Sequence, residues 1–191
     1  MFALWCATPL SLGGLDFKVN EIGITSTVIS AISCPFNLFL YPLLAKRFSS
    51  LHAHQLFAVV FLVLILLAPN IHYLALIGQT AAVWVLLIAC RVALVTSTCT
   101  CFAAQCLFIC NSVSNEKLGR INGMAVFISD IFRSTSPALT GVLYAASLSQ
   151  QSMSIGFPVN FYLTFIFFSG SALAMVLIMA CSPSNINYKK A

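Results

Sequence analysis

The sequence predicts an all-α, polytopic transmembrane helix bundle, and three observations support this fold class. Of the 191 residues, 60% are hydrophobic and only 7% are charged, whereas ordinary soluble domains carry about 25% charged residues. The mean hydropathy is +1.00. Several apolar runs reach the ~20 residues that a helix needs to cross the hydrocarbon core, which is not the alternating pattern of ~10-residue strands in a membrane barrel. We therefore expect an integral, multi-pass protein whose first partner is the lipid bilayer.

The boundaries of the spans follow from breaks in the apolar pattern. Residues 1–15 are apolar but lack a basic leading region and a clear cleavage site, so we interpret this start as the trailing half of a membrane helix and not as a signal peptide. Residues 56–110 contain a single charge, Arg91, and are too long for one helix, so the chain must fold back near Pro69 or Gly78. The sequence predicts a transmembrane domain over residues 1–182, with one partial and five complete spans at residues 1–12, 22–44, 56–75, 81–111, 118–148 and 158–181.

Polar residues mark the starts of the last two spans. Ser114 is a suitable N-cap, and Glu116 follows in the first turn, where the helix dipole favours an acid. Pro158 suits the first turn of the last helix. After this helix, residues 183–191 are predicted to form a solvated tail.

The basic residues indicate which side of the membrane each loop faces. If the helices alternate in direction, one side has only Lys18, while Arg91 and Arg133 lie within spans. By the positive-inside rule, the basic loops, with His52 and His54 in the first of them, and the C-terminal tail are expected to be cytoplasmic. Because the basic residues form scattered pairs and no stripe, the net charge of +5 predicts no nucleic-acid partner. Six of the nine Lys and Arg residues fall on the cytoplasmic side: Lys46, Arg47, Lys117, Arg120, Lys189 and Lys190.

One span, containing the stretch GRINGMAVFISDIFRSTSPALTG, carries an acid and a base three residues apart. Asp130 and Arg133 share a helix face with Gly123, Pro137 and Gly141. A charge at the centre of a span costs about 2.5–3.5 kcal/mol on insertion scales, so the two charges must pair or face water. Two hypotheses remain open: a site for substrate or proton coupling, and a permanent structural pair.

Arg91 is the other charge within a span, and two interpretations remain open for it as well. It is either a contact for an anion or substrate in the same cavity, where it could also pair with Asp130, or an arginine that reaches to the membrane interface.

The eight cysteines lie mostly within apolar segments and define no disulfide framework. Cys99, Cys106 and Cys110 can share a helix face, but Cys101 points elsewhere and no histidine lies nearby in the sequence, so we expect no metal site and no cofactor. Gln105, in the same stretch, is a better candidate for an interhelical hydrogen bond.

Three stretches resemble a family of transporters. ATPLSLGGLDFKVNEIG and FNLFLYPLLAKRF are similar to the ends of the seventh and eighth helices of major facilitator superfamily proteins, in the branch of tetracycline-resistance-like and zinc-induced-facilitator-like proton antiporters. LGRINGMAVFISDIFRSTSPALTG resembles the eleventh helix, although Ser136 stands where the family usually has glycine and Asp130 is not typical of the family. The matching residues of this stretch are Gly119, Asn122, Gly123, Arg133, Pro137 and Gly141.

This resemblance covers nearly the whole chain and implies a fold and a function. The family has twelve helices in two halves that rock around a cavity at the membrane midplane, and the chain corresponds to the C-terminal half, so an N-terminal half-bundle is expected in cis or in trans. The resemblance implies proton-coupled transport of a small solute by alternating access, with Arg133, Asp130 and Arg91 as candidates for substrate binding or proton coupling. The candidates for helix packing or gating are Gly119, Asn122, Gly123, Pro137 and Gly141.

Two other classes of function were weighed against transport. Because the chain matches only half of the family's twelve helices, one alternative is a truncated membrane protein that does not transport, or a half-transporter that needs a partner half. An intramembrane enzyme is not expected, because the spans contain a single acid, Asp130, and no arrangement of Ser and His or of metal ligands.

Overall fold

The computed structural model describes residues 1–47, 49–149, 154, 156–158 and 160–181, and these residues form helices and no strand. The predicted all-α fold class is therefore confirmed. The tail predicted at residues 183–191 lies outside the described residues. The helices are α1 (Phe2–Ala7), α2 (Val19–Arg47), α3 (Ser50–Leu67), α4 (Ile71–Leu76), α5 (Thr80–Ser112), α6 (Asn115–Ser147) and α8 (Tyr162–Ala180), with short 3₁₀ turns at Leu10–Leu12 and Ala68–Asn70.

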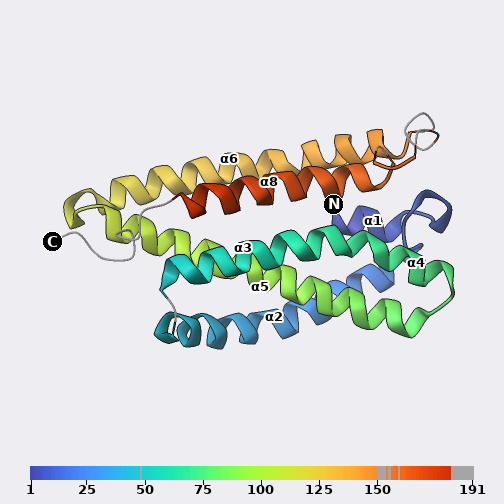
Figure 1. The fold of residues 1–191 in the computed structure, drawn as a ribbon, viewed down its shortest axis with the longest axis horizontal. Helices are drawn as coiled ribbons and strands as arrows, with labels where there is room; N and C mark the ends of the chain where they lie inside the picture. Colours follow the sequence, from blue (N-terminus) through green and yellow to red (C-terminus); the bar gives the residue numbers. More distant parts are fainter. Residues whose placement is uncertain (48, 150–153, 155, 159, 182–191) are drawn as a thin grey trace.

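The long helices lie roughly side by side along one axis (Figure 1). α3 packs against α5 and α8, and α2 packs against α5, so α3 and α5 form the centre of the bundle. α6 runs beside α8 and has fewer contacts with the rest of the bundle. The loops after α2 and α5 lie at the same end, toward which α8 also runs, so that Arg47 and the start of α6 are brought to one end of the bundle.

Four stretches are long and apolar enough to cross a membrane: Val19–Leu40, Ser50–Leu76, Thr80–Ser112 and Tyr162–Ala180. Within the described residues, α6 is not among them, although it has 33 residues, as α5 has. Its composition sets it apart, because polar and charged side chains along its length lower its hydropathy. If α6 lies within the hydrocarbon core of a membrane, its polar face therefore needs water or protein beside it.

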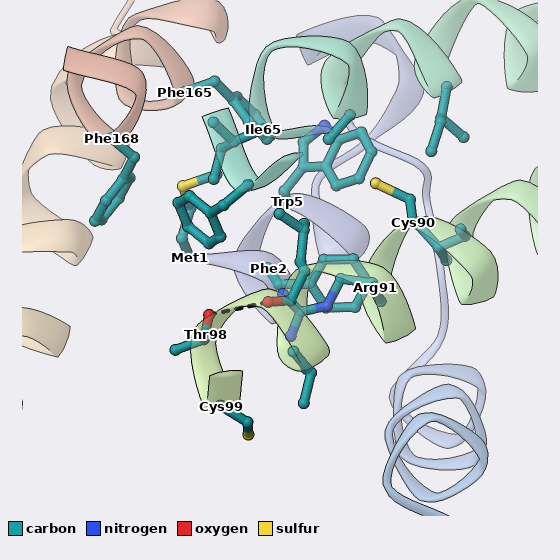
Figure 2. Close-up of a pocket in the computed structure, with 16 residues that line it drawn as sticks. Met1, Phe2, Trp5, Ile65, Cys90, Arg91, Thr98, Cys99, Phe165 and Phe168 are labelled. Carbon is teal, nitrogen blue, oxygen red and sulfur yellow. Dashed lines mark hydrogen bonds between the residues drawn. The ribbon is translucent and has the colours of Figure 1, made fainter. Parts of the chain in front are cut away.

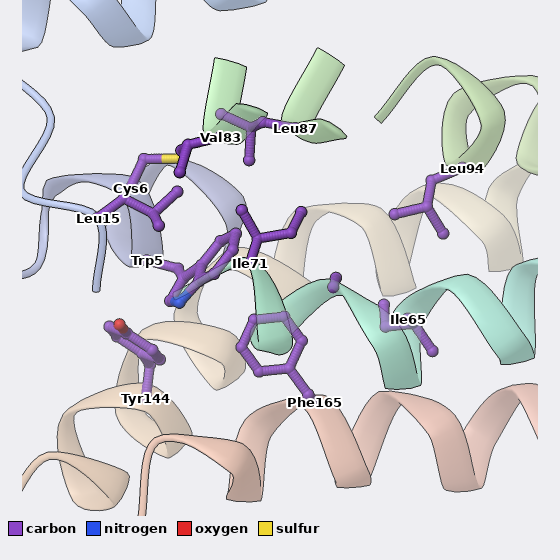
Figure 3. Close-up of a cluster of buried hydrophobic side chains, with 11 residues drawn as sticks. Trp5, Cys6, Leu15, Ile65, Ile71, Val83, Leu87, Leu94, Tyr144 and Phe165 are labelled. Carbon is purple, nitrogen blue, oxygen red and sulfur yellow. The ribbon is translucent and has the colours of Figure 1, made fainter. Parts of the chain in front are cut away.

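Buried side chains gather where α1, α4 and the first half of α5 meet, with α8 and the end of α6 beside them (Figure 3). Trp5 lies at the centre with 1% of its surface exposed, and its ring meets the Phe165 ring edge-on with centroids 5.4 Å apart. We call this group the Trp5 cluster. Because lipid tails are as apolar as these side chains, the cluster is held together by close packing more than by exclusion of water. Its members are Trp5, Cys6, Leu15, Ile65, Ala68, Ile71, Val83, Leu87, Leu94, Tyr144 and Phe165.

The turn after α1 is tied to the Trp5 cluster by hydrogen bonds to its backbone. Trp5 Nε1 donates to the Gly13 carbonyl oxygen at 3.0 Å, and His72 Nδ1 lies 2.8 Å from the Gly14 carbonyl oxygen. Gly13 has a φ of 87°, and a Cβ on Gly14 would collide with the carbonyl oxygen of Thr8. The turn therefore requires glycine at both positions.

The helix starts differ in part from the sequence-based expectations. The prediction that His52 and His54 lie in a loop is wrong, because α3 already begins at Ser50, where Ser49 Oγ accepts a hydrogen bond from the His52 N–H at 3.4 Å. Ser114 is the N-cap residue of α6, without a side-chain capping bond. α8 begins at Tyr162, beyond Pro158, and Asn160 Oδ1 accepts from the Tyr162 N–H at 3.2 Å.

Candidate functional site

Asp130 and Arg133 form an ion pair on α6. Arg133 Nη1 lies 4.0 Å from Asp130 Oδ1, and the two side chains are 64% (Arg133) and 62% (Asp130) exposed. An exposed pair at this separation contributes little to the stability of a fold. Within the described residues, the pair is therefore a weak link and not a buried anchor of α6.

α6 has two unlike faces, and both are open. The face with Asp130 and Arg133 is small and polar, while the opposite side presents Ile128, Phe132 and Leu139, all more than half exposed. A Cβ added to the glycines of the polar face, Gly119, Gly123 and Gly141, would meet nothing within 4 Å. Asn122 is exposed on the same helix, as is Pro137 within its interior. No described helix therefore packs closely against these five positions.

α6 is attached to the bundle mainly near its C-terminal end. Its buried residues are Thr140, Tyr144 and Ser147. Tyr144 belongs to the Trp5 cluster, and its hydroxyl donates to Thr8 Oγ1 at 2.9 Å. In the middle of the helix, the Arg133 guanidinium lies over the Phe102 ring of α5 with its Cζ atom 4.9 Å from the ring centroid, within the range of a cation–π interaction. Arg133 therefore has two partners, Asp130 and Phe102.

Arg91 lies apart from this pair, in a cavity of about 360 Å³ beside the Trp5 cluster (Figure 2). Its Cζ atom is 4.0 Å from the centroid of the Phe2 ring, and its Nε atom is buried without a hydrogen-bond partner among the described residues. Arg91 thus packs on Phe2 and does not pair with Asp130, which Arg133 occupies.

A second buried polar group lies toward the other end of α5. His54 has 0% of its surface exposed, and its Nε2 atom is 3.3 Å from Nε2 of Gln105, so Gln105 makes the interhelical contact for which it was a candidate. Sequence reasoning missed the burial of His54. The spacing of Leu51, His54, Ala58 and Ile65, which are all buried on α3, is the signal that could have found it.

The site contains no cluster of metal-binding groups within the part of the chain that the structure describes. No three His, Cys, Asp or Glu side chains come together there. All eight cysteines are free thiols, and Cys101 and Cys6 are buried. The chemistry of the described site is therefore that of two arginines, one carboxylate and a set of hydroxyl and amide groups.

Comparison with known proteins finds similarity to parts of transporters. No family model and no solved structure matches it. It is 31% identical over 137 residues to the major facilitator superfamily multidrug transporter mfsB of Aspergillus fumigatus, an alignment that covers 71% of this chain and 22% of that protein.

Two plant proteins from Arabidopsis thaliana are also similar. Protein ZINC INDUCED FACILITATOR 1 is 23% identical over 166 residues, which cover 86% of this chain and 33% of the relative. A probable peptide/nitrate transporter is 28% identical over 153 residues, which cover 79% of this chain and 30% of the relative. The chain thus spans a third or less of the length of these curated relatives. The similarity supports the resemblance to major facilitator superfamily transporters and does not single out one branch of them.

Proposed function

We propose that this chain, a relative of major facilitator superfamily transporters, forms one wall of the solute path of a secondary active transporter. In this proposal a small solute crosses by alternating access, and its movement is coupled to protons. The relatives support transport as the class of activity. Their names differ in the solutes that they mention, so the solute of this chain has to be inferred from its own residues.

The observation that carries the proposal is the open polar face of α6. Asp130 and Arg133 are both exposed at the middle of a helix whose opposite side is apolar. Facing lipid, each charge would cost about 2.5–3.5 kcal/mol on insertion scales, against a return of only about 0.3–0.6 kcal/mol for each Leu or Ile. The apolar side therefore suits lipid, and the polar side suits a water-filled path.

The pair offers a way to couple a proton to a change of partner. Protonation of Asp130 removes its negative charge and so weakens its hold on Arg133, which already contacts Phe102 of α5. Arg133 is then free to bind an anionic group of the solute or to move with α5. Deprotonation of Asp130 restores the original pair, so one proton accompanies each exchange.

The proposed orientation places the C-terminal tail and the basic loops in the cytoplasm. Arg47 and the start of α6, with Lys117 and Arg120, lie toward one end of the bundle (Figure 1), and Lys18 precedes α2, which begins at the other end. This distribution is what the positive-inside rule requires. Gly119, Asn122, Gly123, Pro137 and Gly141 would then face the path or the helices that close it.

The alternative is a half-transporter that needs a partner half, or a membrane protein that does not transport. Its supporting observation is the same open face, because the described helices do not enclose a path along α6. We propose that further helices, in the same polypeptide or in a second one, cover this face. Small residues at Gly119, Gly123 and Gly141 suit the close approach of such helices.

Cysteine accessibility tests the proposal without knowledge of the solute. In a variant that lacks the eight native cysteines, Ser134→Cys places a thiol on the polar face, and Phe132→Cys places one on the apolar face. A charged maleimide that does not cross membranes should label Ser134→Cys at least about tenfold faster, because a thiolate forms only where water reaches it. Equal rates for the two positions would contradict a water-filled path along α6.

A further inference from the structure

The face of α5 that is turned toward α3 and α8 carries polar side chains at regular intervals. Arg91, Thr98 and Gln105 are each seven residues apart, so they lie in one row along the helix. This row is not the polar face of α6, which belongs to a different helix. It borders two cavities that lie between α5, α3 and α8.

The first cavity, of about 360 Å³, contains a cation without an anion. No acidic residue of the described chain lies within ion-pair distance of Arg91. The titratable groups beside it are the thiols of Cys6 and Cys90, which are mostly uncharged at neutral pH, and the amino group of Met1, which also lines the cavity and is no anion. Phe2 covers one face of the guanidinium, and Nε has no hydrogen-bond partner among the described residues. The remaining lining is almost entirely apolar, including Trp5.

The second cavity, of about 380 Å³, adjoins the first. Phe61, Thr98 and Phe168 line both cavities and therefore form the neck between them. Gln105 lines the far part, where its amide also contacts the buried His54. Each cavity has a volume within the range of about 300–1,000 Å³ that is typical of small-molecule sites.

We propose that this crevice binds a monocarboxylate with an apolar chain, with the carboxylate on Arg91 and the chain extending past Thr98 toward Gln105. A guanidinium offers parallel N–H groups that match the two oxygens of a carboxylate, and Nε is one of the groups left open here. The apolar lining suits the chain, and a charge buried among apolar groups is stabilised only when it is paired. Neither Asp130 nor Arg133 lines the two cavities, although Phe102, over which Arg133 lies, borders the second.

The same chemistry, one anionic group on an apolar chain, is also present in acidic phospholipids of the bilayer. The experiment must therefore separate a soluble carboxylate from a lipid anion. A monocarboxylate would be the solute of the proposed transporter, and this role rests on the proposed function. Binding itself requires no transport, so a failure to bind is distinguishable from the labelling test on α6.

Fluorescence quenching by a brominated carboxylate tests the site directly. The chain has two tryptophans, and Trp84→Phe leaves Trp5, which lines the first cavity, as the sole reporter. The full chain is reconstituted in phosphatidylcholine vesicles and titrated with 2-bromodecanoate, whose bromine lies next to the carboxylate. Its uncharged methyl ester is the matched control. We expect saturable quenching that is half-complete at a concentration at least about tenfold lower for the acid than for the ester, because a hydrogen bond to a charged group contributes about 1.5–3 kcal/mol.

Substitutions at Arg91 identify the cation. Arg91→Gln should raise the half-saturating concentration of 2-bromodecanoate at least about tenfold, and Arg91→Lys should raise it less, because lysine keeps the charge and loses the fork geometry. Arg120→Gln, at the exposed start of α6, is the control and should change nothing. Equal quenching by acid and ester, or an unchanged titration in a helical Arg91→Gln protein, would overturn the proposal.

A substitution in the second cavity keeps the proposal testable if Arg91 variants do not fold. Ala172 is buried and lines that cavity, so Ala172→Leu shortens the space for the chain. The substitution should raise the half-saturating concentration of 2-bromodecanoate about fourfold or more, since one buried methylene contributes about 0.8 kcal/mol. It should leave the half-saturating concentration of 2-bromobutyrate unchanged. Equal effects on both acids would contradict the placement of the chain.

Acidic lipid distinguishes the two sources of the anion. We expect the titration with 2-bromodecanoate to be the same in vesicles with and without phosphatidylglycerol. If phosphatidylglycerol raises the half-saturating concentration about tenfold or more, the occupant is a bilayer lipid, and the assignment of a soluble carboxylate is overturned.

Discussion

The Trp5 cluster and the middle of α6 show opposite ways of using a membrane helix. In the cluster, side chains of α1, α3, α5 and α8 interlock around Trp5, and a glycine turn is tied to them by hydrogen bonds. Along α6, no residue before Thr140 is buried. The cluster therefore positions α6 at one end, near Tyr144, while the rest of the helix is left open for other contacts.

The arginines in the middle parts of α5 and α6 repeat this contrast. Arg91 is half-buried beside the cluster, with its Nε atom out of contact with solvent, lies over Phe2 and lacks an anion among the described residues. Arg133 is exposed, has its anion in Asp130 and contacts Phe102. A half-buried cation without an anionic partner suits a binding site, whereas an exposed pair with a second partner suits an exchange. We therefore propose different roles for them, with Arg91 holding the carboxylate of the solute and Arg133 exchanging partners with Asp130 as a proton moves.

Arg133→Ala should produce the largest effect on function. We expect transport by the complete transporter to fall about a hundredfold or more, because Asp130 loses the partner whose release would couple the proton to transport. Proteoliposomes that contain a trapped pH-sensitive dye would measure solute-driven proton movement, with a small-molecule extract of the source cells as the solute supply.

Two further variants serve as controls for this prediction. Arg120→Ala, on the same helix but at its exposed start, should leave transport unchanged. Asp130→Asn should retain the protein in the membrane and remove the dependence of transport on the pH gradient. Undiminished transport in Arg133→Ala would exclude this residue from the mechanism and leave the pair a structural one.

Trp5→Ala should have the largest effect on stability. It removes the centre of the cluster and the hydrogen bond to Gly13, and a buried Trp→Ala change typically costs about 3–5 kcal/mol. Trp84→Ala is the matched control, since Trp84 is partly exposed and stacks on Phe17 with ring centroids 5.0 Å apart. Thermal unfolding in detergent should show a clearly larger loss for Trp5→Ala. Equal losses would mean that the cluster is not the anchor of the bundle.

Tyr144→Phe tests the attachment of α6 with a smaller change. The substitution keeps the ring in the cluster and removes the hydrogen bond from the hydroxyl to Thr8 Oγ1. A loss of about 1 kcal/mol is expected, because Thr8 Oγ1 still donates to the Leu4 carbonyl oxygen. Hydrogen exchange should become faster near the C-terminal end of α6, and exchange near Asp130 should change little. A uniform change along α6 would contradict attachment at one end.

The membrane fold was predictable because the apolar pattern and the breaks between helices are local properties of the sequence. Of the two places at which a return of the chain was expected, the chain reverses at Gly78, between α4 and α5, whereas the 3₁₀ turn at Ala68–Asn70 lies within the continuous stretch Ser50–Leu76. The burial of His54 was indicated by local spacing on α3, but its partner was not predictable in this way, because Gln105 is distant in sequence. Tertiary contacts decide such positions.

For the candidate site, the spacing of residues along a helix was more informative than their expected depth in the membrane. Asp130 and Arg133 pair because three residues separate them on a helix. The environment of Arg91 depends on Phe2 and on the cavity between three helices, which no local pattern encodes. The open space at Gly123 was equally hidden, since small residues in a span indicate close packing without naming the partner.

Gly123→Ala should have the smallest effect on the chain alone, and it separates the two regions most sharply. A Cβ at Gly123 meets nothing within 4 Å, so alanine should leave stability unchanged or raise it by up to about 1 kcal/mol through its higher helix propensity. Gly14→Ala is the contrast, because its Cβ would collide with the Thr8 backbone carbonyl and the turn cannot yield without losing the bond to His72. Thermal unfolding of the two variants measures this difference.

If Gly123→Ala lowers transport in the complete transporter while the chain alone stays stable, the open face of α6 is covered there by another helix at close range. A destabilised Gly123→Ala chain would mean instead that α6 already packs on its polar side.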